Sequence, residues 1–374
     1  MARKCFIGVG DKAKEARSIF LGVNGVAKPI KKAYIGVNGV ARPCFSGVSI
    51  PDYYGAVTGF ATRYRAAAVT LDDVMIIAGG LNASGSSLST AEAVNKNLEH
   101  IAVPNLAGSS AGGEAIGAAA GDYAVFCTDD GSKIASVYSK NFVASYLEGF
   151  QYHAYTYGVA AVSFNGHALL TGSANSATRT CVFSVDKNLV VNELADMQKT
   201  RRFYAAAQNW SYALFAGGSD RASSATTCYA TVDAYDKNLV HTAAPDLGSA
   251  KQRAAGARAG NYAVFAGGAS KDPSSALGKY KTVDAYDRKL TRTSVTNLTN
   301  GMYDYNGITL GECALFAGNA AADCYDNRLA KVNATAPSGN RMNAAAGVIG
   351  DFGIFIGGGA SYSTATNTAD AYLA

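Results

Sequence analysis

The sequence of 374 residues is poor in several residue types, and each scarcity narrows the functions open to it. Its four histidines are scattered, and none of its seven cysteines lie in a CxxC pair. A histidine-based metal centre, a zinc ribbon and a thioredoxin-type redox site are therefore not expected, and neither a cofactor nor a bound metal is predicted. No apolar run approaches the roughly 18 residues of a membrane span, and no Walker loop or dinucleotide fingerprint occurs.

Positive charge is concentrated at the N-terminus of the chain. Residues 1–46 contain nine Lys or Arg and two acidic residues, a net charge of +7, while the remaining residues carry a net charge of −2. The first residues lack the apolar middle of a signal peptide, so we expect the chain to be made in a cytoplasm without a signal peptide. A basic head on a near-neutral body predicts two parts with different roles.

The basic head consists of three gap-free 14-residue repeats that begin at Cys5, Ile19 and Ala33. The second and third repeats each place Asn-Gly between valines, the strongest short-range signal for a hairpin, because a type I′ turn needs positive φ at both central residues. We therefore predict β-hairpins over residues 1–48. The residues proposed for attachment are Asn24, Gly25, Lys31, Lys32, Asn38, Gly39 and Arg42.

The rest of the chain, residues 49–374, contains a longer repeat. An apolar run that ends in Gly-Gly or its equivalent recurs seven times, starting at residues 74, 123, 167, 212, 262, 313 and 352. Steps of this size match the period of four-stranded propeller blades. Segments rich in Ala and Gly precede most of these runs, as expected for inner strands crowded around an axis. The sequence therefore predicts an all-β, seven-bladed β-propeller.

The last repeat indicates how the ring closes. Six repeats carry a turn after the third strand, as in Asp236-Lys-Asn-Leu, whereas the seventh ends at Ala374 without that turn and lacks a fourth strand. A strand-like segment near Tyr53 belongs to no repeat of its own. We predict that residues 53–60 supply the outer strand of the last blade, because such closure removes an exposed sheet edge.

Two resemblances follow from these repeats. The long repeat resembles a kelch-type β-propeller, on the Gly-Gly doublets at 79–80, 217–218, 267–268 and 357–358 and on Tyr235, Tyr286 and Tyr372; it departs from that type in lacking the kelch tryptophan, and its second and third repeats lack the doublet. The short repeat, GVNGVAKPIKKAYIGVNGVARP, resembles hairpin repeats of tail and baseplate-associated proteins from phages of Gram-positive bacteria and related prophage elements. This resemblance implies an attachment segment followed by a distal recognition domain.

Aromatic and basic residues stand immediately before the predicted inner strands, at equivalent positions of the repeat. The fold should gather them around one mouth of the channel, where Tyr and Arg provide rigid area and forked hydrogen bonding suited to glycans and protein hot spots. The alternative is that these side chains seal the blade junctions. The candidate ligand-binding residues are Tyr64, Arg65, Tyr152, His153, Arg202, Tyr204, Arg253, Tyr303 and Arg341. Whether the polar loops after the doublets share this face is left open by the sequence.

Catalytic motifs are weak. Gly108-Ser-Ser-Ala-Gly112 fits the G-x-S-x-G pattern, but it lies between two repeats instead of at a strand-to-helix turn. The segment Thr128-Asp-Asp-Gly fails the spacing of a calcium loop. No catalytic residue is predicted, and the chain is not expected to be an enzyme.

The leading hypothesis is a phage or prophage-derived tail protein, located in the virion and receptor-binding. Residues 1–46 would dock to tail or baseplate proteins, and the propeller would recognise a host-surface glycan or protein. We expect a homo-oligomer in the particle, with no nucleic acid bound and no membrane insertion. Two alternatives stay open: a purely structural virion protein whose propeller packs on neighbouring subunits, and a carbohydrate-active propeller enzyme.

Overall fold

The computed structural model describes six short strands in the first 50 residues and most of the chain from Pro51 onward. The described ranges after residue 50 are 51–107, 113–128, 134–150, 158–173, 180–220, 227–270, 278–318, 320–361 and 364–374. The chain divides into two compact units, Met1–Ile50 and Pro51–Ala374. Within the described residues, no helix has the length and apolar character needed to cross a membrane.

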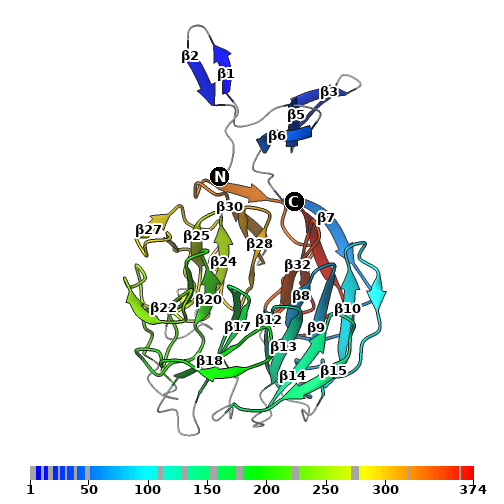
Figure 1. Cartoon of the computed structure of the whole chain (residues 1–374), viewed down its shortest axis with the longest axis vertical. Helices are drawn as coiled ribbons and strands as arrows, with labels where there is room; N and C mark the ends of the chain where they lie inside the picture. The colour runs from blue at the N-terminus through cyan, green and yellow to red at the C-terminus, as the bar shows by residue number, and fades with distance from the viewer. Residues whose placement is uncertain are drawn as a thin grey trace. The chain divides into compact units, whose positions relative to one another are not determined.

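The first unit contains three two-stranded antiparallel hairpins (Figure 1). They are β1 (Phe6–Val9) with β2 (Lys12–Glu15), β3 (Phe20–Val23) with β4 (Val26–Pro29), and β5 (Lys32–Val37) with β6 (Val40–Ser46). In the second and third hairpins, Val23 pairs with Val26 and Val37 with Val40, so the valines that flank each Asn-Gly pair in the sequence face each other in the register. Of the proposed attachment residues, Lys32 begins β5 and Arg42 lies in β6. Outside the described residues are Asn24, Gly25, Lys31, Asn38 and Gly39.

The second unit consists of seven four-stranded antiparallel sheets arranged in a ring, which confirms the predicted seven-bladed β-propeller (Figure 1). Blades 1 to 3 hold β8 (Ala67–Leu71), β9 (Val74–Ala78), β10 (Ala91–Asn95) and β11 (His100–Ile101); β12 (Ala115–Ala120), β13 (Tyr123–Thr128), β14 (Ala135–Ser139) and β15 (Ala144–Leu147); and β16 (Ala161–Phe164), β17 (His167–Ser173), β18 (Thr180–Val185) and β19 (Val191–Glu193).

Blades 4 to 6 hold β20 (Ala205–Gln208), β21 (Tyr212–Ala216), β22 (Val232–Asp236) and β23 (His241–Ala244); β24 (Ala255–Ala259), β25 (Tyr262–Ala266), β26 (Val283–Tyr286) and β27 (Arg292–Val295); and β28 (Gly307–Leu310), β29 (Cys313–Gly318), β30 (Ala321–Tyr325) and β31 (Lys331–Ala334). Blade 7 holds β32 (Ala345–Ile349), β33 (Phe352–Ile356), β34 (Ala369–Leu373) and β7 (Asp52–Val57). The inner strands contact one another in succession, and the ring closes where β32 contacts β8.

Strand β7 is the fourth strand of blade 7, although it comes first in the second unit. It pairs antiparallel with β34, with Val57 opposite Ala369 and Asp52 opposite Leu373. The Tyr53 hydroxyl donates a hydrogen bond of 2.7 Å to Asp370 Oδ1 on β34. Sequence analysis placed this closing segment at residues 53–60, whereas the strand itself spans residues 52–57. Phe60 beyond it is buried and packs edge-on against the His100 ring at 4.5 Å between ring centroids.

Small side chains let the inner strands approach the axis and their neighbours closely. A Cβ atom on Gly117 of β12 would lie 2.7 Å from a methyl group of Val69 in blade 1, and 2.8 Å from the ring of Phe126. These distances are too short for real side-chain contacts, so the glycine is required by packing. Apolar side chains of the second and third strands fill the space between blades, and most of them are fully buried. The core is therefore divided into layers that lie between successive blades.

The Gly-Gly doublets mark where the second strand turns against the next blade. Gly217 and Gly218 have φ values of 73° and 101°, which disfavour any residue with a Cβ. A Cβ on Gly217 would lie 2.5 Å from the Lys251 carbonyl oxygen of the next linker, and one on Gly218 would lie 2.7 Å from that of Arg202. The Gly218 N–H donates to the Lys251 carbonyl at 2.8 Å. The close approach at Gly217 thus joins two blades, and the one at Gly218 brings the doublet against the linker that leads into its own blade.

A β-bridge next to each doublet shows which loops share a face of the propeller. Ser219, directly after a doublet, forms a β-bridge with Arg202, which precedes the inner strand of the same blade. Blades 1, 5 and 7 repeat the same bridge with Leu81, Ala269 and Gly359. The doublet loops therefore begin on the same face as the segments that lead into the inner strands.

Candidate functional site

A ring of equivalent residues surrounds the channel on this face; we call it the mouth ring. In every blade except blade 2, its member has a positive φ between 50° and 75°, shortly before the inner strand. The members are Arg65, Glu114, Gly158, Phe203, Arg253, Asp304 and Asn343. In blades 1, 4, 5, 6 and 7, the backbone N–H of the member donates to the carbonyl of the member in the preceding blade, as Asn343 does to Asp304 at 2.7 Å and Arg65 does to Asn343 at 2.7 Å. These bonds tie the blades together around the opening.

Between blades 2 and 3, the hydrogen bond that links the mouth ring has a different acceptor. There the Gly158 N–H donates to the side-chain Oε2 of Glu114 at 2.6 Å, so a carboxyl group takes the place that a backbone carbonyl occupies elsewhere. Burial raises the pKa of Glu114 to about 7, while the hydrogen bond from Gly158 and the charge of Arg65 act in the opposite direction. A carboxyl group that can hold or release a proton near neutral pH therefore forms part of the mouth ring.

The mouth ring lines a cavity of about 320 Å³ at this end of the channel. Below the ring, the walls are mostly alanine and glycine from the inner strands, such as Ala67, Ala160 and Gly256. The charged side chains that line the cavity, Arg65, Glu114, Arg253 and Asp304, all belong to the mouth ring, as does the amide Asn343. A volume at the small end of ligand pockets, with a few polar groups on a rigid scaffold, suits a small polar ligand or one residue of a larger one.

Charges of both signs meet in this cavity. Arg253 Nη1 lies 2.6 Å from Asp304 Oδ2, and the Arg253 guanidinium stacks over the Phe203 ring at 4.0 Å from its centroid. Burial raises the pKa of Asp304, and the neighbouring Arg253 lowers it. These contacts hold the Arg253 fork in one orientation, which favours recognition of a planar or polyhydroxyl group.

Three of the nine sequence-predicted ligand-binding residues line the cavity: Arg65, Tyr204 and Arg253. Tyr204 is only 5% exposed, and its hydroxyl donates to Thr171 Oγ1 at 2.7 Å, so the phenol is used within the protein. Tyr152 and His153 lie outside the described residues. Ligand binding by these residues stays a prediction.

The other four predicted residues do not line the cavity: Tyr64, Arg202, Tyr303 and Arg341. Tyr64 and Arg202 are buried in the β-bridges to the doublet loops. The Tyr303 ring is half-buried, with the Lys279 ammonium 5.2 Å from its centroid. Arg341 is 2% exposed, and its Nε lies 2.6 Å from Asp370 Oδ2. This difference in position has a geometric reason: the mouth-ring residues line the cavity, while these four residues lie one or two positions earlier in the chain.

Arg341 takes part in a buried ion pair of a kind that recurs in several blades. An acid on the third strand accepts a backbone N–H from the linker ahead of its blade and pairs with a basic residue three positions later in that linker. The sets are Ser338, Arg341 and Asp370; Gln198, Arg201 and Asp233; and Gly248, Lys251 and Asp284. Arg63 pairs similarly with Glu92 in blade 1 at 3.1 Å. These buried cations hold the linkers in place. Their contacts are of the kind expected under the alternative in which side chains before the inner strands seal the blade junctions.

Third-strand tyrosines provide a second contact of this kind. Their hydroxyls donate to carbonyl groups of the linker that precedes their blade, over distances of 2.7–3.0 Å. The tyrosines are Tyr138, Tyr235, Tyr286, Tyr325 and Tyr372, and all are fully buried. Burial raises the pKa of each of them. The tyrosines that suggested a kelch-type repeat therefore join the blades, and none of them lines the cavity.

Sequence reasoning did not select Glu114, Asp304 and Asn343. The signal that could have found them is the repeat itself, because each occupies the position of Arg65 and Arg253 in its own blade. Selection by residue type favoured Tyr and Arg, whereas selection by repeat position would have found the acids and the amide.

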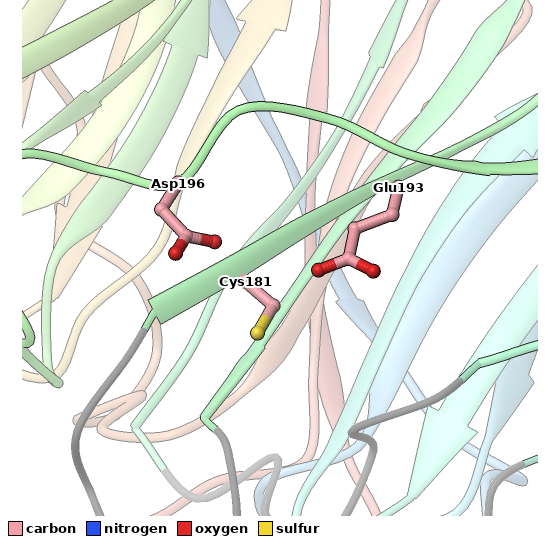
Figure 2. Close-up of side chains that lie close together, drawn as sticks. All are labelled: Cys181, Glu193 and Asp196. Atoms are coloured by element: carbon pink, nitrogen blue, oxygen red, sulfur yellow. The ribbon is translucent and has the colours of Figure 1, made fainter.

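A second group of polar side chains lies in blade 3, away from the mouth. Figure 2 shows Cys181 on β18, Glu193 on β19 and Asp196 just beyond it, with their side chains directed toward one another. One potential ligand atom from each lies within 4.8 Å of the others. Cys181 is buried, whereas Glu193 is exposed and Asp196 half-buried. Three donors, two of them water-accessible carboxylates, fall short of the four-ligand set of a structural zinc site, so the group carries no assignment.

Comparison with known proteins bears on the fold alone. No protein-family model matches the sequence, and no curated protein matches it significantly. The structure is similar to that of YjhT. The match has a TM-score of 0.52 at 10% sequence identity, and it covers 74% of this chain and 99% of that chain. At this identity the likeness establishes the propeller fold and leaves the function to be argued from the site.

Proposed function

We propose that this chain is a phage or prophage-derived tail protein whose propeller binds a host-surface ligand at the mouth ring. The supporting observation is that five of seven equivalent positions bring a charged or amide side chain to one cavity, among walls of alanine and glycine. Packing alone does not require such groups, because Gly158 and Phe203 occupy the same position in other blades. A saccharide is the favoured ligand class, since its hydroxyls match paired acids and arginines.

The first unit supports the attachment half of this proposal. Residues 1–46 carry the net charge of +7 and fold into hairpins that belong to a compact unit of their own. Isolated two-stranded hairpins are marginally stable in water, so they gain from docking onto a partner. Basic hairpins suit an acidic surface on a tail or baseplate protein.

A carbohydrate-active enzyme is the second candidate, and one observation favours it. Glu114 holds a proton near neutral pH in a cavity that also contains Arg65 and the Arg253–Asp304 pair. A carboxyl group with a pKa of about 7 can act as a general acid or base in sugar chemistry. Release of reducing ends from host polysaccharide by the purified chain would favour this candidate over simple binding.

The binding proposal is tested by competition on cells. Purified chain in excess should prevent tail particles from adsorbing to susceptible cells, and the Arg65→Ala and Arg253→Ala variants should compete about tenfold less well. The matched control is Lys140→Ala, which removes an exposed cation that pairs with Asp122 on the outside of blade 2. Absence of competition by the unaltered chain would favour the structural virion protein. Full competition by both arginine variants would exclude the mouth ring as the binding site.

A further inference from the structure

A strained tryptophan lies on the face opposite the mouth ring. Trp210 is the first residue of the two-residue turn that joins β20 to β21, and its φ is 69°. In the other six blades this turn position holds Asp72, Gly121, Asn165, Gly260, Gly311 and Gly350, which are residue types that tolerate a left-handed backbone. A bulky aromatic residue there is an outlier, and such outliers concentrate at functional sites.

The turn around Trp210 is held in place by polar contacts. The Trp210 N–H donates to Gln208 Oε1 at 2.7 Å. Asn209 Oδ1 accepts from the Tyr212 N–H at 3.0 Å, and Asn209 Nδ2 donates to the Asp287 carbonyl of blade 5 at 2.6 Å. The indole is therefore presented from a backbone fixed on both sides and anchored to the next blade, which lowers the entropic cost of binding.

The indole has one neighbour that is well defined and a large exposed surface. The Arg258 guanidinium of β24 lies over the Trp210 ring at 4.3 Å from its centroid, while Trp210 remains 48% exposed. Arg258 Nη1 donates to the Gly260 carbonyl at 2.9 Å. Burial lowers the pKa of Arg258, and the charge of Glu312 acts in the opposite direction. The guanidinium thus supports the indole from one side and leaves surface available to a ligand.

Polar groups surround this indole. Arg288 is exposed, and its Nε donates to Ser211 Oγ, next to Trp210, at 3.0 Å. Glu312 is exposed on the corresponding turn of blade 6. Among the described residues, the other large hydrophobic side chains that are strongly exposed belong to outer strands or to turns between outer strands: Tyr54, Val143, Tyr146, Val190 and Val240. The indole is therefore a single apolar platform bordered by hydrogen-bonding groups.

We propose that Trp210, with Arg258 beneath it, forms a second saccharide-binding site that stacks one pyranose ring. A pyranose has an apolar face of C–H groups and a rim of hydroxyls, so it matches an isolated indole with polar neighbours. A protein partner would instead favour a contiguous apolar patch around the aromatic anchor. This site lies on the opposite face from the mouth ring, and the inference does not depend on the function proposed for that ring.

The test uses the fact that the chain has a single tryptophan, so fluorescence excited selectively at tryptophan reports on this site alone. Three soluble probes are titrated into the full chain: maltotetraose, the β-1,4 tetramer of N-acetylglucosamine, and tetragalacturonate. We expect at least one to shift or quench the emission in a saturable manner. Absence of a saturable change with all three would overturn the proposal.

Variants decide whether the indole itself binds. By calorimetric titration, Trp210→Ala and Trp210→Asn should both weaken binding of the active probe by about tenfold or more. Asn is the residue of blade 3 at this position, so Trp210→Asn should keep or raise the thermal unfolding midpoint while it loses binding. The control Val240→Ala, an exposed apolar side chain of the same blade, should bind within about twofold of the unaltered chain. Retained binding in Trp210→Asn, or a marked drop in its unfolding midpoint, would overturn the proposal.

Discussion

Blade 4 and blade 3 share four antiparallel strands, but they are joined to their neighbours by different means. In blade 4, Asp233 pairs with Arg201 at 2.5 Å and the Tyr235 hydroxyl reaches the linker carbonyl of Ala195. In blade 3, Phe183 and Val185 occupy those two positions of the third strand. Phe183 is fully buried and packs edge-on against Phe150, with 5.5 Å between ring centroids. A blade can thus be joined to the ring through polar contacts or through apolar packing.

The two blades also differ where the second strand ends. In blade 4, β21 stops at Ala216 because Gly217 and Gly218 turn with positive φ, whereas β17 of blade 3 continues to Ser173. Next to blade 3, the mouth ring is linked through the Glu114 side chain instead of a backbone carbonyl. The comparison teaches that every blade keeps the same four strands, while the side-chain contacts that join it to its neighbours differ from blade to blade. One variation, Glu114, adds a titratable group to the candidate site.

The largest effect should come from removing the acid of blade 4. Asp233→Ala leaves the fully buried Arg201 without its counter-ion and removes the acceptor of the Gln198 N–H, so the free energy of unfolding should fall by about 3–5 kcal/mol. Ser136→Ala, at the equivalent position of blade 2, removes one hydroxyl bond to Ala107 and should cost about 1 kcal/mol. Denaturant unfolding measures both, and equal losses would show that the buried ion pair contributes no more to stability than a neutral hydrogen bond at the same position.

A smaller effect should depend on pH at the junction of blades 2 and 3. The pKa of Glu114 is raised from the ordinary 4.5 to about 7, so the folded protein holds this proton more tightly than the unfolded chain does. The stability from this group is complete below about pH 4.5 and is lost as pH rises through about 7, by at most about 3 kcal/mol. Glu114→Gln should flatten the fall in unfolding free energy over this window. An unchanged pH profile in that variant would assign the dependence to other groups.

The smallest effect of the three should come from a doublet glycine. Gly217→Ala puts a Cβ 2.5 Å from the Lys251 carbonyl oxygen and forces alanine to a φ of 73°, so stability should fall by about 2 kcal/mol. Gly339→Ala is the matched control, because nothing lies within 4 Å of a Cβ there and its φ is ordinary. Thermal unfolding of the two variants side by side measures the difference. If both variants unfold at the same temperature, close backbone approach is not what the doublet provides.

The sequence by itself determined the all-β class and the number of blades. The period of the repeat gives the number of blades, and its composition gives the strand class. The reason is that every blade must bury the same two faces and place one strand, rich in small residues, close to the axis. Tertiary structure decided which residues line the cavity. Arg63 and Arg65 are two positions apart and chemically alike, yet one is buried against Glu92 and the other lines the cavity. Arg65 takes its direction from the left-handed backbone of the mouth ring, and Arg63 takes its direction from Glu92, an acid on a strand distant in sequence. Both causes exist only once the ring of blades has closed.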